Sequence, residues 1–427
     1  REGPGRLPAQ GVTASRGWAA ATGAALGAAL ATKHTAVILP LALLLAWFWC
    51  RWEGAAASRR GWPILIGTAW LVLCAAYGFR EPILRHAVDG AELAALVPGR
   101  MFDAPAAWLY AHAPLPDFYL RSLLFNLRHV SAGGPVYAAG QYATHAPWWY
   151  TPLVLGVKLP VLTLAALLAT AASLFVRRPA PSEKLLVVCS GLLLAAAVAS
   201  GLALGLRVLL PALAVGFILA GRLGPAVTAW LDKHPRRAWA LAAVIAAHAV
   251  SVGSVLPHSL AYANELAGGP ARIDRWLVDS NLDWGRGLPQ LRSYMDEAKP
   301  DRLLLTYTGS ASPGFYGLRY EDILSTEFSG IAVPPLPATA GGRKARPYER
   351  QDPDRHPGVR TQYATKNGRT LWAISLTALH APNARFHPLF APLLARRPVA
   401  RVAHAFAVYD LTDDPNLLRF AESLARR

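Results

Sequence analysis

The stretch NELAGGPARIDRWLVDSNLDWGRGL, residues 264–288, governs the interpretation of the whole chain. It follows the last membrane-length apolar run, which ends near residue 257, and it opens a long polar C-terminal region. Within it, GGP at 268–270 is typical of a turn. DSNLDWG at 279–285 combines two carboxylates, an amide, a hydroxyl and an indole, which suits the edge of a sugar or a phosphate. The same segment also fits a capped helix start, with Asp283 as the N-cap of a helix that runs to about Met295.

The composition indicates a membrane protein. Of the 427 residues, 53% are hydrophobic and only 16% are charged, and the mean hydropathy is +0.27. A soluble protein of this size is ordinarily less apolar. The formal net charge of +17 raises nucleic acid as a partner, but no helix-turn-helix, zinc-finger or RNA-binding signature accompanies it. We therefore expect no nucleic-acid partner, and we attribute the charge to loops that face the anionic lipid of the bilayer.

Seven apolar runs approach the length of ~17–25 residues that a membrane-spanning helix needs. They cover about residues 17–31, 35–50, 61–79, 150–176, 184–205, 207–222 and 238–256, within a predicted transmembrane domain 17–256. Thr32-Lys33-His34 separates the first two, which form either a tight helical hairpin or one broken helix. Residues 1–16 are a polar stretch rich in Gly, Pro and Arg, and we expect the chain to be a fragment or a processed form.

Basic residues gather in three short connections between these runs: Arg51, Arg59 and Arg60; Arg177, Arg178 and Lys184; and Arg222, Lys233, Arg236 and Arg237. Under the positive-inside rule, all three connections are cytoplasmic. The alternation of spans then places the loop 80–149 and everything after about residue 257 on the opposite side. We therefore predict an integral protein of an inner or plasma membrane, with an extracytoplasmic C-terminal region.

Three cations interrupt the apolar pattern at the outer ends of predicted helices: Lys33, Lys158 and Arg207. A cation at the edge of a span is costly and by default marks a functional site. Together the three predict a pocket for a lipid-linked phosphate, in which they would stabilise the leaving group as its charge develops. Taken singly, Lys158 also fits a side chain that snorkels to the interface, and Arg207 fits the start of a helix.

The loop 80–149 is too long for a passive connection, and it is rich in aromatic residues where it enters the next span. Trp148 and Trp149 fit an interfacial aromatic belt. Alternatively, short amphipathic helices in this loop roof a cavity and stack a sugar or a lipid head group.

Beyond residue 257 the pattern becomes that of an α/β domain, residues 257–427. Strand candidates are 302–307, 370–376 and 400–409, and residues 335–368 have the composition of a flexible insertion. The histidines of this region have no metal-ligand spacing, and the cysteines form no disulfide framework. These residues are His356, His380, His387 and His404, and Cys50, Cys74 and Cys189.

Several motifs occur in the order found in a known family. NELAGGP at 264–270 and DSNLDWG at 279–285 resemble the segment after the last transmembrane helix of bacterial family 39 glycosyltransferases. The similarity extends to TKHT at 32–35, GQY at 140–142, WWY at 148–150, GLRVLLP at 205–211, Tyr307, and YGL at 316–318. It covers most of the chain from about Ala19. The family belongs to the GT-C superfamily of polyprenyl-phosphate-sugar-dependent membrane enzymes, which includes protein O-mannosyltransferase-like and aminoarabinose-transferase-like proteins.

The resemblance implies a multi-pass α-helical membrane protein of GT-C type with a C-terminal extracytoplasmic α/β domain. It implies transfer of a sugar from a polyprenyl-phosphate donor to a lipid, glycan or protein acceptor outside the cytoplasm. It also favours a substrate cavity that includes His34, Tyr142, His145 and Tyr150. A further set is expected either to dock the C-terminal domain or to contact substrate: Asn264, Asp279, Asn281, Asp283 and Trp284.

The family's catalytic base lies on a first extracytoplasmic loop that has no counterpart in this sequence. We therefore expect this chain alone to lack transferase activity, and we assign no catalytic residue. Paired acids allow a divalent metal, although nothing in the sequence fixes one. The other hypothesis is a non-enzymatic transporter or lipid-binding membrane protein, which predicts charges near the bilayer midplane and paired broken helices in repeated halves. The sequence has no visible repeat, and its unusual charges lie at the outer edge, which favours the transferase.

Overall fold

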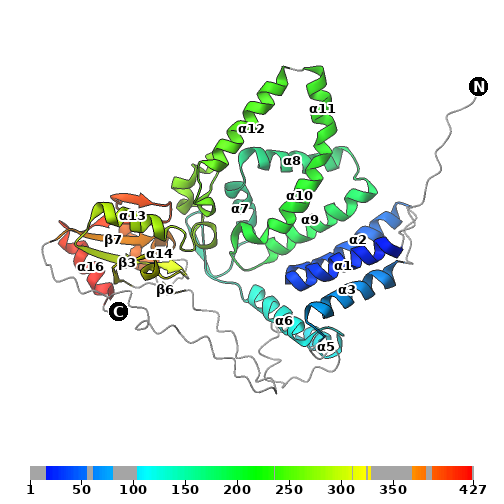
Figure 1. Cartoon of the computed structure of the whole chain (residues 1–427), viewed down its shortest axis with the longest axis horizontal. Coiled ribbons are helices and arrows are strands. Elements are labelled where there is room, and N and C mark those ends of the chain that lie inside the picture. The colour runs from blue at the N-terminus through cyan, green and yellow to red at the C-terminus, as the bar shows by residue number, and fades with distance from the viewer. Residues whose placement is uncertain are drawn as a thin grey trace, which may run out of the picture. The chain divides into compact units, whose positions relative to one another are not determined.

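The computed structural model describes residues 16–54, 61–79, 103–234, 236–309, 311–323, 326–327, 368–380 and 387–425. The chain divides into two compact units (Figure 1). The first contains residues 1–133, 166–202 and 207–233, and the second contains 134–165, 203–206 and 234–427. The start of the loop 80–149, His356 and nearly all of the predicted insertion 335–368 lie outside the described residues.

Helices dominate the described part of the chain. Three of them are long and apolar enough to cross a membrane: His34–Trp52, Pro181–Ala199 and Leu210–Lys233. Trp62–Ala76, Val161–Val176 and Arg237–Gly253 are apolar but shorter. Each of the seven predicted apolar runs thus contains a helix, but fewer helices reach full spanning length than the sequence predicts. Within the third long helical run, Arg222 lies in the 3-10 turn Gly221–Leu223, between the α-helical stretches Leu210–Ala220 and Gly224–Lys233.

In the first unit, close packing joins α1 (Arg16–Thr32) to α3 (Trp62–Ala76). A Cβ atom built on Gly23 would lie 2.4 Å from the Leu65 carbonyl oxygen, and one on Gly27 would lie 2.4 Å from the Ala69 carbonyl oxygen. Small residues four apart let two helix backbones approach in this way. α1 ends before Lys33 because the backbone of Lys33 is extended. The short 3-10 helix His34–Val37 follows it.

The predicted basic connections meet at one end of the first unit. Lys184, in α9 (Pro181–Ala199), forms an ion pair with Glu53, which follows α2 (Ile38–Trp52). Arg222, after α10 (Leu210–Ala220), pairs with Glu183 and donates a 2.7 Å hydrogen bond to the carbonyl of Arg177, which follows α8 (Val161–Val176). Four helix ends are therefore joined by charges that the sequence places on one side of a membrane.

The remaining helices of this unit lie in the predicted long loop and at the end of the third apolar helix. They are α5 (Asp103–His112), α6 (Asp117–Ala132) and α11 (Gly224–Lys233). The α6 helix is amphipathic, because Tyr119, Leu120, Leu123 and Leu124 are its buried residues. One amphipathic helix of the kind expected in the loop is therefore present, and its role over a cavity stays a prediction.

In the second unit, which contains α7, the predicted span 150–176 is interrupted before it continues into the first unit. The α7 helix runs from Tyr150 to Lys158, and α8 begins only at Val161. Between them, Leu159 is extended and Pro160 cannot donate to an upstream carbonyl. The hydrophobic pattern does not reveal this break, because both sides of it are apolar. The unit also contains α12 (Arg237–Gly253), which buries none of its residues.

A five-stranded sheet forms the core of the C-terminal region, with the order β5-β3-β7-β9-β8. Figure 1 labels two of its strands, β3 and β7. Its strands are Glu321–Asp322 (β5), Arg302–Thr306 (β3), Thr370–Ser375 (β7), Phe406–Asp410 (β9) and Ala400–Val402 (β8). The β3 strand pairs in parallel with β5 and β7, whereas β9 is antiparallel to β7 and β8. The predicted strands 302–307 and 370–376 are confirmed. The predicted strand 400–409 is wrong as one unit, since residues 403–405 form a turn between β8 and β9.

Helices cover both faces of this sheet, which accounts for the complete burial of β7. On one face, Leu288, Leu291 and Met295 of α13 (Leu288–Ala298) pack in a cluster with residues of β3, β7 and β9. On the other face, Trp372 contacts Phe390 of α15 (His387–Leu394) and Phe420 of α16 (Pro415–Ala425). The short α14 (Leu376–His380) follows β7 directly. Two strand pairs lie outside the sheet: β1 (Val136–Ala138) with β2 (Gln141–Ala143), and β4 (Thr308–Gly309) with β6 (Thr326–Glu327).

Candidate functional site

The end of α7 is bonded to the first residue of the NELAGGP motif. The side-chain amide of Asn264 donates to the carbonyls of Gly156 at 2.6 Å and Leu159 at 2.8 Å. Its amide oxygen accepts from the backbone N–H of Ala267 at 3.0 Å, and its own backbone N–H donates to Val157 at 2.9 Å. A helix end leaves carbonyls without intrahelical partners, and Asn264, which is 0% exposed, satisfies those that the break creates.

Lys158 and Asn281 meet beside this contact. The Lys158 ammonium donates to the main-chain carbonyl of Asn281 at 2.8 Å and to that of Leu260, and only 6% of the residue is exposed. The Asn281 side-chain amide donates to the Tyr150 hydroxyl at 2.9 Å. Its amide oxygen is buried and has no hydrogen-bond partner among the described residues. A buried acceptor of this kind is costly, so it is a place where a water or a ligand hydroxyl gains a bond.

Gly205 lies against the same amide. Its φ is +68°, and a Cβ atom at this position would lie 2.2 Å from the Asn281 amide oxygen. Only glycine therefore fits there without moving Asn281. We call Tyr150, Lys158, Gly205, Asn264 and Asn281 the Asn281 junction. Its members come from four separate stretches of sequence, and all belong to the second unit.

The Asp283 carboxylate of DSNLDWG binds backbone N–H groups of the turn that follows it. Asp283 accepts from the N–H groups of Gly285 at 2.9 Å and Gly287 at 3.2 Å, ahead of α13. The helix begins at Leu288 with Gly287 as N-cap, so the prediction that Asp283 is the N-cap is wrong. Burial raises the pKa of the Asp283 carboxyl, against the opposing effect of these N–H donors.

Two further residues of the motif are placed around this turn. Asp279 has a φ of +58°, and its N–H donates to the Thr377 hydroxyl at 3.1 Å, which ties the motif to α14. Trp284 is half-buried in the same turn. For Asp279, Asp283 and Trp284 the contact with substrate stays a prediction.

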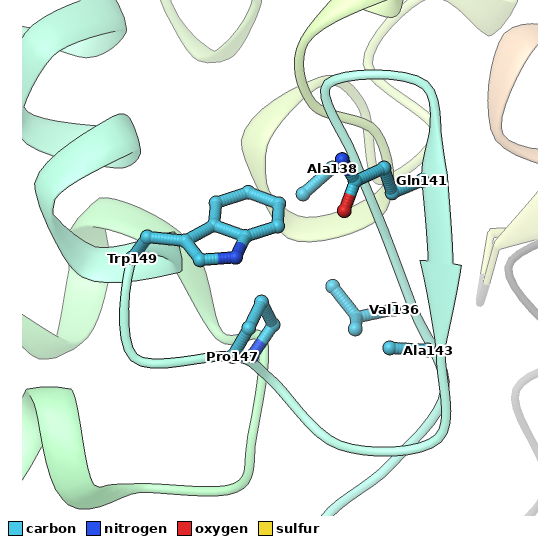
Figure 2. Close-up of a pocket in the computed structure, with 6 residues that line it drawn as sticks. All are labelled: Val136, Ala138, Gln141, Ala143, Pro147 and Trp149. Atoms are coloured by element: carbon cyan, nitrogen blue, oxygen red, sulfur yellow. The ribbon is translucent and has the colours of Figure 1, made fainter.

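A shallow pocket lies between the β1–β2 hairpin and the start of α7 (Figure 2). Its volume is about 80 Å³. The Trp149 indole and Pro147 form one side, and Val136, Ala138, Gln141 and Ala143 of the hairpin form the other. It is much smaller than the ~300–1,000 Å³ of ordinary ligand sites, so it accommodates at most a small group.

The predicted cavity residues are not all brought together. Tyr150 belongs to the Asn281 junction, whereas Tyr142 lies on the hairpin with its ring 5.1 Å from that of Tyr137. Burial raises the pKa of Tyr142 to about 12, so its phenol is a proton donor at neutral pH. His145 is exposed beside Thr144, with 3.0 Å between Nδ1 and the hydroxyl. His34 lies in the first unit, stacked on Tyr119 at 5.4 Å.

The three predicted cations are divided between the units. Lys33 and Arg207 are exposed residues of the first unit, and Lys158 is a buried residue of the second. Their grouping around one phosphate therefore stays a prediction. Lys158 itself is buried and donates to two main-chain carbonyls, so its amine is not exposed as that of a snorkelling side chain would be.

One buried ionic cluster was not predicted. Arg401 donates from both terminal nitrogens to the Asp274 carboxylate, at 2.9 and 3.0 Å, and His380 Nε2 lies 3.5 Å from the same carboxylate. The His380 ring also packs on Tyr137 at 4.5 Å between centroids. Burial opposes ionisation of Asp274, but the hydrogen bonds and charges of His380 and Arg401 outweigh it and lower its pKa to about 2. The cluster joins β8, α14 and residues 270–275, which lie more than a hundred positions away, and no local pattern marks it.

Within the described ranges, no three His, Cys, Asp or Glu side chains are grouped as they would be around a metal ion. The divalent cation therefore stays a prediction. The side chain of His387 lies outside the described residues. His380 lies beside the Asp274 carboxylate, and His404 is half-buried. Comparison with known proteins gives no match: no family model, no curated protein and no solved structure matches this chain.

Proposed function

We propose that this chain is the membrane part of a glycosyltransferase that takes a sugar from a polyprenyl-phosphate donor and transfers it outside the cytoplasm to a lipid, glycan or protein acceptor. One observation carries the proposal. Four of the motifs that resemble the family in sequence each contribute a residue to the Asn281 junction. They are WWY at 148–150, GLRVLLP at 205–211, NELAGGP at 264–270 and DSNLDWG at 279–285.

The chemistry of the junction supports the proposal. Lys158 places an amine at a buried position, where it donates to two neutral main-chain carbonyls. A buried ammonium without a carboxylate partner attracts a phosphate strongly, because the interaction is screened less than at the surface. The Asn281 amide oxygen adds an acceptor for a sugar hydroxyl. The finer topology, with an extracytoplasmic α/β domain after residue 257, belongs to the same proposal.

The first test is binding of undecaprenyl phosphate to the purified chain in nanodiscs, at two salt concentrations. Parent protein is compared with Lys158→Met and Arg207→Ala, and exposed Lys233→Ala is the matched control. We expect micromolar affinity that weakens about 10- to 100-fold for each lost cation, the range for a charged hydrogen bond of ~1–3 kcal/mol. Melting temperatures of the variants separate lost binding from lost folding. Absence of binding, or an affinity for undecaprenyl phosphate that neither substitution changes, would contradict the proposal.

A second candidate is a non-enzymatic carrier of lipid phosphate, and the break between α7 and α8 favours it. Discontinuous helices are typical of transporter binding sites. The two candidates differ in how they treat the sugar. A transferase site binds a polyprenyl-phosphate sugar more tightly than the bare polyprenyl phosphate, whereas a carrier of the lipid phosphate binds the two equally.

A further inference from the structure

Two histidines from distant parts of the second unit face each other. The ring centroids of His258 and His404 lie 6.4 Å apart, and the ring planes are 78° from parallel. His258 follows α12, and His404 lies in the turn between β8 and β9. Both are half-buried, and neither imidazole has a hydrogen bond to another residue in the described part of the chain.

Arg286 is fixed next to the first of these histidines. Its guanidinium donates to the carbonyl of Pro257 at 2.9 Å and to the hydroxyl of Ser259 at 3.3 Å, the residues on either side of His258. These two bonds use part of the five N–H donors of the guanidinium. The remaining donors are available on a side chain whose position is already determined.

The next residue, Gly287, holds the same segment against the second histidine. A Cβ atom on Gly287 would lie 3.1 Å from the Cβ of Ala403 and 3.0 Å from the Cβ of Ala405, the neighbours of His404. Arg286 therefore contacts the two residues that flank His258, and Gly287 packs against the two residues that flank His404. Arg286, His258 and His404 consequently surround one small region of surface.

The turn that carries His404 is strained. Ala403 and His404 have φ values of +55° and +56°, in the left-handed region. Two successive residues in this region are typical of hairpin turns, where Gly and Asn are preferred. A non-glycine residue in this conformation brings its Cβ atom close to the following carbonyl oxygen and is strained. The turn thus bears an imidazole where glycine or asparagine would be more stable.

The charges around the two histidines favour an anionic ligand over a cationic one. Burial, together with the positive charges of His258 and Arg401, lowers the pKa of His404. Of the nearby carboxylates, Asp274 is paired with Arg401, and Asp283 is turned toward the N–H groups of Gly285 and Gly287. In the described ranges no carboxylate pairs with His258, His404 or Arg286. A metal cation is disfavoured by this surplus of positive charge, whereas an anion removes it.

We propose that His258, His404 and Arg286 form a binding site for a phosphodiester group. Arg286 offers a planar pair of donors, and each imidazole offers one N–H to the phosphate oxygens. A lipid head group and a soluble phosphodiester share this chemistry. The site follows directly after the apolar α12, and it shares no residue with the Asn281 junction, so it stands independently of the proposed glycosyl transfer.

The test uses the full chain in phosphatidylcholine nanodiscs with dimethyl phosphate and with short-chain phosphatidylglycerol as probes. Both are phosphodiesters whose charge is constant between pH 6 and pH 8, so any pH dependence belongs to the protein. Because the bound anion favours the imidazolium, we expect affinity to fall about tenfold from pH 6 to pH 8, which corresponds to one unit in a single pKa. We also expect the probe to raise the pKa of His404 in a histidine NMR titration.

The variants are His404→Asn, which keeps a residue suited to positive φ, and Arg286→Gln, with exposed His112→Gln as the matched control. Each site variant is expected to weaken binding about tenfold or more while leaving the melting temperature nearly unchanged. Tighter binding of phosphatidylglycerol than of dimethyl phosphate identifies a lipid head group, and equal binding identifies a soluble phosphodiester. Affinity that is the same in all variants, or that rises with pH, overturns the proposal, as does binding of Zn²⁺ in place of the phosphodiester.

Discussion

The ammonium of Lys158 donates a 2.8 Å hydrogen bond to the main-chain carbonyl of Asn281, across 123 positions of sequence. Side-chain identity at position 281 is not needed for this bond, but it is needed for the second bond, from the Asn281 amide to Tyr150. The two ends of α7, Tyr150 and Lys158, are thus both fixed to one residue of the DSNLDWG motif. Substitutions in this motif are therefore expected to act on α7.

Asn264→Ala removes three side-chain hydrogen bonds, to Gly156, Leu159 and Ala267. It leaves buried carbonyls without donors, so we expect a loss of about 2–4 kcal/mol in the free energy of unfolding. The control is Asn416→Ala, whose side chain is exposed on α16 and bonds only locally, to Arg419. Thermal unfolding in detergent checks both, and equal melting temperatures for the two variants would contradict the structural role of Asn264.

Gly205→Ala places a methyl group 2.2 Å from the Asn281 amide oxygen, at a residue whose φ is +68°. Backbone strain and displacement of Asn281 together should cost about 2–4 kcal/mol. Gly253→Ala is the matched control, since a Cβ there meets nothing within 4 Å and the helix gains stability from alanine. A melting temperature for Gly205→Ala at or above that of the parent would show that the junction is not closely packed.

Asp274 should make the second unit sensitive to acid. Its pKa of about 2 lies below the ordinary value of 3.8, so its contribution to stability is complete above pH 3.8 and is lost as the pH falls toward 2. The shift corresponds to about 2 kcal/mol. Unfolding midpoints measured from pH 5 to pH 2 should fall less steeply for Asp274→Asn than for the parent. Parallel curves would show that Arg401 and His380 do not stabilise the charged carboxylate.

The predicted orientation can be checked by cysteine labelling in cells. In a background without Cys50, Cys74 and Cys189, we expect His145→Cys to react with a membrane-impermeant maleimide in intact cells. We expect Arg178→Cys to react only after permeabilisation, because the positive-inside rule predicts that the basic connections lie on the cytoplasmic side. The opposite labelling pattern would invert the topology, and equal labelling of both would contradict a membrane-spanning arrangement.

The sequence predicted the elements whose side chains repeat regularly, and it failed where long-range contacts decide the backbone. Strands β3 and β7 were predictable from their runs of Leu, Trp and Ile. The turn at Ala403 and His404 was not, because residues with positive φ are usually Gly or Asn. The break after Lys158 was missed because the residues on both sides of Lys158 and Pro160 are apolar, and the whole run predicts one span.

The candidate site was predictable only in part. The motifs named Lys158, Asn264, Asn281 and Tyr150, but their mutual contacts and the role of Gly205 required the structure. The ion pair of buried Asp274 with Arg401 had no sequence signal, since an Asp and an Arg more than a hundred residues apart look like ordinary surface charges.

The broken end of α7 also bears on how the protein is made. The carbonyls of Gly156 and Leu159 receive their donor from a residue that is 108 and 105 positions later in the chain. At a synthesis rate of about 5–20 residues per second, Asn264 leaves the ribosome roughly 5–20 s after α7. During that interval these carbonyls need another donor, and the hydrocarbon core supplies none. We therefore expect the end of α7 to wait at the wet surface of the bilayer until residue 264 arrives.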